Sequence, residues 1–514
     1  MVGKREQSRV YLISLGCPKN RVDSEVMLGH LVDGGFELVD RPEDADIIVV
    51  NTCGFIDAAK EESVDTILEM AQHKANGTCR KLVVSGCLSQ RYAPALAAEI
   101  PEVDHFLGTG NFGSVATVLG GGKAHARLPV IRELLASPAG HRRERGDYHP
   151  RLMGRNALVP YRHDARLAGK RSVVIPDPDF TLSAGSPRLR SLPHYTTYVK
   201  VSEGCSNSCS FCIIPKIRGP QRSRPVADVV REVERLVAEG VVEINLIAQD
   251  LCAYGKDLGG GQSLPQLLRA LDAVGGDRPL WIRCLYAYPR GLTTEVLEVM
   301  AGARHILPYL DIPLQHINER ILRRMRRGKG GRATRDLLTR ARATVPGLVL
   351  RTAFITGFPS ETEAEFEELC DFVREARFEH LGVFTFSPEE DTDAAGFANP
   401  VPAEVAAERR ERLMALQQKL SREQQEIKVG KTLPVLVEGV STETELLLQG
   451  RHPGQAPEID GVTYINAGTA SPGEVVAVRV TQAADYDLVG GIVPPRRKAA
   501  PGKGDAMDLP AEGG

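Results

Sequence analysis

The sequence predicts an α/β protein of several domains: an N-terminal doubly wound parallel domain, a central partial barrel, and a small C-terminal antiparallel β-barrel. Two features of the pattern predict it. Short apolar runs alternate with helix-like stretches over residues 8–123 and again over 191–421. From about 424 to 491 the chain changes to short strands separated by glycine turns. A length of 514 residues with 42% hydrophobic residues is enough for three such cores.

The first region has the pattern of parallel strands that are buried on both faces. We expect its strands in three nearly continuous apolar runs, "RVYLISLGC", "ADIIVVNTC" and "RKLVVSGC". Helix-like stretches such as "AAKEESVDTILEMAQHK" lie between them. Strands and helices that alternate in this way predict a doubly wound sheet.

The interval 124–190 breaks this pattern. It is rich in Arg, Pro, Gly and His and shows no steady period. Such a composition predicts a linker or insertion, partly disordered, between the first and second domains.

The α/β alternation resumes over 191–421, where helical segments separate six strand-like segments. The six are "TTYVKVSEG", "VVEINLIAQD", "PLWIRCLYAYP", "LPYLDIPLQH", "GLVLRTAFITGFP" and "HLGVFTFSPEE". Six strand–helix units predict an open or partial TIM-like barrel, whose chemistry lies at the C-terminal ends of its strands.

The last patterned region, 424–491, contains short strands such as "TLPVLVEGV" and "GVTYINAG". They predict a small β-barrel of the OB type. The tail 492–514 is expected to be disordered because it is short of large apolar residues.

The composition narrows the class of protein. No long apolar run predicts a membrane span, and the N-terminus lacks the apolar segment of a signal peptide, so we expect a cytosolic protein. There the ten cysteines are expected to be ligands, catalytic groups or core residues rather than disulfides. The net charge of −2 gives no general attraction to nucleic acid, which weakens an RNA-substrate hypothesis.

The densest chemical motif is "EGCSNSCSFC", which places Cys205, Cys209 and Cys212 within eight positions. Zinc and iron–sulfur sites usually take four protein ligands, so three thiolates leave one position open. A zinc site completed by a distant ligand and incidental core cysteines are the alternatives. The spacing, the aromatic Phe211 before the last cysteine and the lack of a second CxxC pair favour an iron–sulfur cluster.

Three further cysteines share a position relative to predicted strands. Cys17, Cys53 and Cys87 each stand at or just beyond the C-terminal end of a predicted parallel strand. Because those ends meet at one edge of the sheet, where open α/β proteins bind ligands, the three thiols are expected to form a second cluster site. The alternative is that each is a small buried hydrophobe. We expect a structural role for the remaining four cysteines, Cys79, Cys252, Cys284 and Cys370.

The spacing CxxxCx-aromatic-C resembles the radical S-adenosylmethionine (SAM) superfamily. The resemblance implies a 4Fe-4S cluster in which three thiolates hold three irons and the fourth iron binds the amino and carboxylate groups of SAM. The position without a protein ligand is therefore a substrate-binding position. A catalytic role for Cys205, Cys209 and Cys212 follows from the same resemblance.

Other positions are candidate SAM contacts under this resemblance. The segment "FITGFPSETEAEF", 354–366, follows a strand and opens a helix, so Gly357 and Glu361 belong either to an ordinary turn or to a SAM-contacting one. Gln249 and Asp250 end a predicted strand and either contact SAM or substrate or cap that strand. Phe211 is expected beside the cofactor.

The basic run "RRMRRGKGGR", 323–332, admits two interpretations. It is a solvated helix face, or it contacts ribosomal RNA or an acidic partner.

The whole arrangement resembles the methylthiotransferases, and the terminal module resembles a TRAM domain. Six segments are similar in sequence to the RimO branch of this family: "SLGCPKNRVDSE", "NTCGFI", "AQDLCAYG", "YLDIPLQH", "GVFTFSPEEDTDAA" and "APEIDG". This branch methylthiolates the β-carbon of an aspartate in ribosomal protein S-twelve, so the resemblance implies two 4Fe-4S clusters, SAM, an electron donor such as flavodoxin or ferredoxin, and a sulfur donor. A MiaB-like tRNA adenosine methylthiotransferase and a non-catalytic iron–sulfur scaffold that binds RNA are the alternatives.

Overall fold

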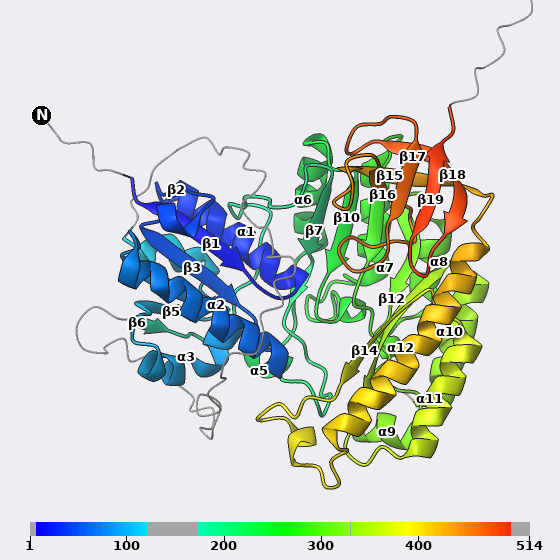
Figure 1. The fold of residues 1–514 in the computed structure, drawn as a ribbon, viewed down its shortest axis with the longest axis horizontal. Coiled ribbons are helices and arrows are strands. Elements are labelled where there is room, and N and C mark those ends of the chain that lie inside the picture. Colours follow the sequence, from blue (N-terminus) through cyan, green and yellow to red (C-terminus); the bar gives the residue numbers. More distant parts are fainter. Residues whose placement is uncertain (1–6, 121–171, 329, 495–514) are drawn as a thin grey trace, which may run out of the picture.

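The structure is a computed structural model that describes residues 7–120, 172–328 and 330–494 (Figure 1). It confirms the predicted architecture of two parallel α/β sheets followed by a small closed β-barrel. Within the described residues, no helix combines the length and apolar character needed to cross a membrane. The predicted tail lies outside the described residues from 495 onward.

The N-terminal domain is a six-stranded, all-parallel sheet in the order β2-β1-β3-β4-β5-β6. Its strands are β1 (Arg9–Ser14), β2 (Glu37–Leu38), β3 (Ile47–Thr52), β4 (Lys81–Gly86), β5 (His105–Leu107) and β6 (Ser172–Val174). Its helices are α1 (Pro18–Asp33), α2 (Asp57–Asn76), α3 (Cys87–Glu99) and α4 (Val115–Val118). Every residue of β3 is buried, which explains its unbroken apolar run.

The strand order of this sheet reverses between β1 and β3, because β2 lies on one side of β1 and β3 on the other. Ligands of open α/β sheets bind outside the carboxyl ends of the strands at such a switch point. The topology therefore selects the β1–β3 edge as the place for a site.

Part of the interval 124–190 differs from the predicted linker. Residues 172–174 form β6 and extend the first sheet. Farther along, the buried guanidinium of Arg188 donates to Glu25 of α1 and to Glu232 of α6 (Val226–Ala238), both at 2.8 Å. This segment therefore fastens the first domain to the second. The rest of the predicted linker, up to 171, lies outside the described residues.

The central domain contains the six predicted strands in one open parallel sheet, in the order β14-β13-β12-β11-β10-β7. They are β7 (Thr196–Lys200), β10 (Glu243–Ile247), β11 (Trp281–Cys284), β12 (Ile306–Asp311), β13 (Val349–Thr356) and β14 (His380–Thr385). The other long helices are α7 (Leu264–Gly275), α8 (Thr294–Gly302), α10 (Gly331–Thr344), α11 (Glu363–Ala376) and α12 (Ala403–Glu426). The shorter elements are β8 (Ser202–Glu203), α5 (Ile214–Arg218), β9 (Arg222–Ser223) and α9 (Glu319–Arg324).

The two faces of this sheet are covered by different parts of the chain. Helices pack on the outer face around one large apolar core. On the inner face, Val22 and Val26 of α1 and Leu436 and Ala456 of the C-terminal barrel pack with strand residues such as Tyr309. The open barrel is thus completed by its two neighbouring domains rather than by strands of its own (Figure 1).

The C-terminal domain is a closed five-stranded barrel in the order β15-β16-β17-β19-β18. Its strands are β15 (Thr432–Val440), β16 (Leu448–Arg451), β17 (Thr463–Ala467), β18 (Val475–Ala483) and β19 (Leu488–Ile492). The predicted small barrel is confirmed, but the β17–β19 pair is parallel, whereas all other pairs in it are antiparallel.

A buried ion pair joins this barrel to the central sheet. Arg451 of β16 donates to Glu243 of β10 at 2.7 Å, and Arg283 of β11 donates to the same carboxylate at 3.0 Å. The Glu243 side chain is fully buried, and the two guanidinium groups outweigh that burial and hold its pKa at about 2. The attraction of two cations for one buried carboxylate therefore fixes the terminal barrel in place.

Replacing Arg451 with Met should destabilise the central domain by about 3 kcal/mol, because the Glu243 charge stays buried with one cation fewer. Urea unfolding followed through the fluorescence of Trp281, the single tryptophan, measures this loss. The matched control is Arg479→Met on the exposed side of β18, which should change the free energy of unfolding by less than about 0.5 kcal/mol. Equal stability of the two variants would contradict the role given to Arg451.

Candidate active site

The first cysteine triad lies at the switch point of the N-terminal sheet. Cys17 follows β1, Cys53 follows β3 and Cys87 begins α3 directly after β4. Gly16, with φ of +85°, lies so close to Cys53 that a Cβ there would come within 3.0 Å of the Cys53 sulfur. The glycine before Cys17 therefore permits the close approach of two cysteine-bearing loops.

The three thiols of this triad affect one another electrostatically. Burial, together with the neighbouring Cys87 and Cys17, raises the pKa of Cys53 to about 12. Burial also raises the pKa of Cys87, against the opposing charge of Arg218. Mutual repulsion of three nearby thiolates is relieved when they bind a metal centre, so this donor set fits an iron–sulfur cluster.

The second triad occupies the loop between β8 and α5. Burial raises the pKa of Cys212 to about 12, with further contributions from Cys209 and Cys205, so these thiols are also close neighbours. Side-chain donors surround their sulfurs: Asn207 Nδ2 lies 3.4 Å from Cys205 Sγ, and Arg327 Nη1 lies 3.5 Å from Cys209 Sγ. Hydrogen bonds to sulfur tune a cluster by stabilising its negative charge.

Across residues 7–120, 172–328 and 330–494, no three His, Cys, Asp or Glu side chains are spaced to hold one metal ion. The assignment of each cysteine triad to an iron–sulfur cluster stays a prediction from the sequence.

A short helix connects the two triads. Ile213 and Ile217, which follow Cys212, pack against Cys87 in one apolar cluster. Arg218, at the end of α5, donates from Nη2 to Cys87 Sγ at 3.3 Å. The second triad and the first triad are therefore linked by the few residues from Cys212 to Arg218.

A buried charge network surrounds this connection. Arg218 Nη1 donates to Asp23 of α1 at 2.6 Å, and Lys200 of β7 pairs with both Asp23 and Glu203. Gln249 Nε2 donates to Glu203 at 2.7 Å. Burial acts to raise the pKa of Glu203, but Lys200 and Arg218 outweigh it and hold that pKa at about 2. The Glu203 carboxylate therefore stays ionised at the domain interface, whereas at Asp23 burial outweighs the same two cations and raises the pKa.

A second contact closes the opposite side of the interface. Glu389, in the loop after β14, accepts from Arg91 Nη1 of α3 at 2.7 Å and from Lys60 Nζ of α2 at 3.0 Å. The same Arg91 nitrogen donates to the carbonyl oxygen of Gly54, the residue after Cys53, at 2.7 Å. The segment "SPEED", residues 387–391, therefore docks the first domain beside its own cysteine triad.

The predicted contacts Gln249 and Asp250 lie next to the second triad. Asp250 accepts from Asn207 at 2.7 Å and caps the turn that follows β10, which is the capping role considered for it. The buried Oε1 of Gln249 has no hydrogen-bond partner among the described residues. An unpartnered buried amide oxygen is expected to meet a ligand donor, so Gln249 is the stronger candidate for a cofactor contact.

The predicted contacts at 357 and 361 have packing roles in this structure. Gly357, with φ of +76°, has no room for a Cβ, which would lie 2.3 Å from the Ala406 side chain of α12. Glu361 accepts from Arg409 of α12 at 3.2 Å, while burial raises its pKa to about 7. Both residues hold the turn against α12, and their contact with SAM stays a prediction. Phe211 packs with Phe358 in one apolar cluster, so the turn does lie near the cysteine loop.

The basic run is partly solvated, with Arg323, Arg326 and Arg332 exposed, but two of its arginines have a role that neither predicted interpretation covers. Arg327 lies over the Tyr288 ring at 4.0 Å and donates to Cys209, while Arg324 lies over the Phe397 ring at 4.6 Å. The Tyr288 hydroxyl is itself 3.9 Å from Cys209 Sγ. Part of the run therefore supports the second triad, a role that sequence reasoning missed because Tyr288 is far away along the chain.

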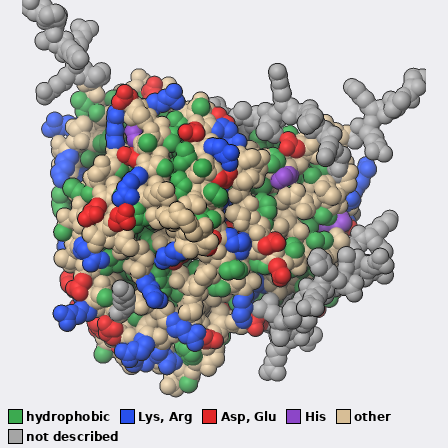
Figure 2. Space-filling view, turned by 180° about the vertical axis from the view of Figure 1, so that it is seen from behind, with side chains coloured by type: hydrophobic (Ala, Val, Ile, Leu, Met, Phe, Trp, Pro, Cys, Tyr) green, Lys and Arg blue, Asp and Glu red, His purple; other side chains and the backbone are tan. Residues whose placement is uncertain are grey.

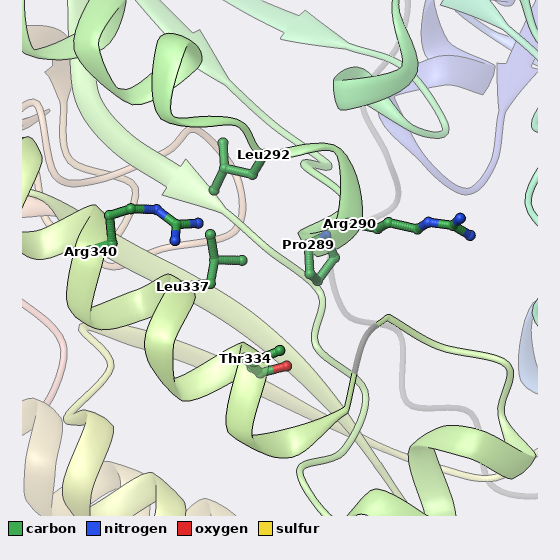
Figure 3. A pocket seen from close by; sticks show the side chains of 7 residues that line it. Pro289, Arg290, Leu292, Thr334, Leu337 and Arg340 are labelled. Atoms are coloured by element: carbon green, nitrogen blue, oxygen red, sulfur yellow. The ribbon is translucent and has the colours of Figure 1, made fainter.

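A small cavity of about 90 Å³ lies nearby, between the turn after Tyr288 and α10 (Figure 3). Leu292 and Leu337 face one another across it, and Arg290 extends away on the other side of the turn. No cysteine lines it. It is therefore separate from the two triads.

Comparison with known proteins agrees with this geometry. Residues 9–108 match the uncharacterized protein family UPF0004, residues 199–373 the radical SAM superfamily, and residues 429–493 the TRAM domain. The chain is 52% identical to ribosomal protein uS12 methylthiotransferase RimO of Anaeromyxobacter sp. (strain Fw109-5), over 95% of this chain and 93% of that protein. The chain belongs to the RimO family.

Two further likenesses accompany this assignment. RimO of Geobacter sulfurreducens is 44% identical over 95% of this chain and 99% of that protein. Among solved structures, the chain resembles the radical SAM methyltransferase TsrM of Kitasatospora setae, with a TM-score of 0.49 and 17% identity, covering 76% of this chain and 74% of that one.

Anaerobically reconstituted protein should hold about eight irons per chain, four at each triad. Replacing Cys205, Cys209 and Cys212 together with Ala should halve the iron and abolish SAM cleavage. Iron analysis and quantification of 5′-deoxyadenosine measure the two effects. Cys370→Ala, which removes a buried thiol of α11, is the matched control and should keep all the iron. Formation of 5′-deoxyadenosine by the triple variant would refute the assignment.

Proposed function

We propose that this RimO-family protein attaches a methylthio group to the β-carbon of an aspartate in ribosomal protein uS12. The observation that carries the proposal is the pair of three-cysteine sites joined through Cys212–Arg218, in a chain whose relatives carry the uS12 methylthiotransferase name over nearly their full length. One site suits radical formation and the other suits sulfur supply, and the transfer needs both side by side.

In this proposal Cys205, Cys209 and Cys212 hold the 4Fe-4S cluster that binds SAM, while Cys17, Cys53 and Cys87 hold the auxiliary cluster. When bound, these groups supply the radical that removes hydrogen from the substrate carbon and the methylthio group that replaces it. With only Cys205, Cys209 and Cys212 as protein ligands, the first of these clusters would keep one position for SAM.

The residues of the chain itself bind and orient the reacting groups and shield them from water. Asn207 and Arg327 donate hydrogen bonds to sulfurs of the radical triad, and Arg218 donates to Cys87 in the auxiliary triad. Ile213 and Ile217 place apolar surface between the triads, which limits the access of water. The buried charge network around Glu203 holds the two domains in a fixed relative position, so that both triads face the same substrate.

The partners follow from this reaction. The protein substrate is uS12, an electron donor such as flavodoxin or ferredoxin reduces the radical site, and a separate donor supplies sulfur. The TRAM barrel is a candidate contact for ribosomal RNA, and a ribosomal substrate places the reaction in the cytoplasm. Acidic and basic side chains are interspersed on the face shown in Figure 2, and the net charge is −2, which favours a protein over an RNA substrate.

Mass spectrometry of ribosomal proteins from cells with and without this protein tests the proposal. We expect a gain of about 46 Da on one aspartate of uS12, because SCH3 replaces one hydrogen. Bulk tRNA from the same cells should be unchanged. Methylthioadenosine in tRNA together with unmodified uS12 would move the function to a tRNA methylthiotransferase.

Replacing Cys17, Cys53 and Cys87 with Ala should separate the two halves of the reaction. SAM cleavage should persist because the radical triad is intact, whereas methylthio transfer should fall below detection. Assays of 5′-deoxyadenosine and of modified uS12 on the same sample measure both. If the variant instead loses its circular dichroism signal, the three cysteines serve the core of the domain.

A further inference from the structure

Lys19 is a buried cation beside the auxiliary triad. It lies in the first turn of α1, two positions after Cys17, and its side chain is mostly removed from water, with 7% of the residue exposed. Its Nζ lies over the Tyr286 ring, 2.7 Å from the centroid. Among the described residues, no carboxylate lies within ion-pair distance of this ammonium. Buried charges are normally paired, and a cation–π contact compensates only part of the lost hydration.

The carboxylates around Lys19 are committed to other groups. Asp311 accepts from Arg351 Nη1 and from the backbone nitrogen of Tyr286, both at 3.0 Å. Asp23 and Glu203 share Lys200 and Arg218, as described above. Lys200 and Arg218 each pair with these two carboxylates, whereas the Lys19 ammonium has the Tyr286 ring and the nearby Cys17 thiol as its neighbours.

The position of Lys19 also connects the two triads. Tyr286, under the ammonium, and Tyr288, beside Cys209, are two positions apart in the segment after β11. Tyr286 has φ of +64°, a strained conformation for a non-glycine residue, of the kind that clusters at functional sites. This short segment therefore contacts both the Lys19 ammonium and Cys209 of the second triad.

We propose that the Lys19 ammonium binds the carboxylate of the substrate aspartate and holds its β-carbon between the two triads. The inference rests on the proposed function, and it names the group that recognises the acidic side chain. The aspartate carboxylate is bonded directly to the β-carbon, so holding one fixes the position of the other. A side chain without the negative charge leaves the ammonium unpaired and is bound more weakly.

The competing explanation is that Lys19 compensates the negative charge of the auxiliary cluster. In that case its removal changes the cluster itself, through the iron content or the reduction potential. In the proposal its removal changes the discrimination between acidic and neutral substrates and leaves the cluster as it was. The two explanations therefore differ in a readout that does not depend on turnover.

The test uses reconstituted holoenzyme and full-length uS12, either unchanged or with the modified aspartate replaced by Asn. Equilibrium binding of both forms is measured for the wild type, Lys19→Met, Lys19→Arg and the control Arg21→Met, which removes a cation of the same helix that pairs with Glu458. We expect the wild type and Arg21→Met to prefer the aspartate form by at least about tenfold in Kd. Lys19→Met should bind both forms equally, and Lys19→Arg should restore part of the preference.

The outcomes separate the inference from the function on which it rests. A wild type that modifies uS12 but binds both forms equally overturns the role of Lys19 while the function stands. The same conclusion follows if Lys19→Met keeps the full preference, or if it loses iron or shifts the potential of the auxiliary cluster. A wild type that neither binds nor modifies uS12 rejects the proposed function itself.

Discussion

The buried contact of Arg218 with Asp23, Glu203 and Cys87 is the interaction on which the rest of the site depends. It joins the end of the cysteine loop of the barrel to α1 and to the last cysteine of the N-terminal domain. A guanidinium is suited to this position because it remains charged when buried and offers several donors in a fixed plane. The two domains are therefore held together next to the cysteine triads. The contacts of Arg188 and Glu389 stabilise the same placement of the two domains.

Much of the fold could be predicted because it follows from local periodicity. The six barrel strands and the three cysteine-ending strands were visible as apolar runs, since a parallel strand buried on both faces is nearly continuous in its hydrophobicity. The convergence of Cys17, Cys53 and Cys87 followed from the rule that parallel strands end at one edge. Each of these inferences needs only neighbouring residues and one rule of topology.

The rest could not be predicted because it is made by residues far apart in the chain. β6 follows an irregular stretch and is recognisable only once β5 is beside it. Gly357 has the sequence appearance of a ligand-binding turn, but the helix that excludes a side chain there begins some forty-six positions later, at Ala403. The basic run gave no sign that Arg327 would lie over Tyr288. Contacts between distant segments require the assembled structure.

The helix α5 has a consequence for how such a chain can evolve. Only six positions separate Cys212 from Arg218, and Ile213 and Ile217 occupy the same face as they pack on Cys87. Inserting or deleting one residue there turns everything beyond it by about 100° around the helix axis. Such a change would point the guanidinium away from Cys87 while leaving each cysteine triad complete. The contact with Cys87 therefore tolerates a substitution in this segment better than a change in its length.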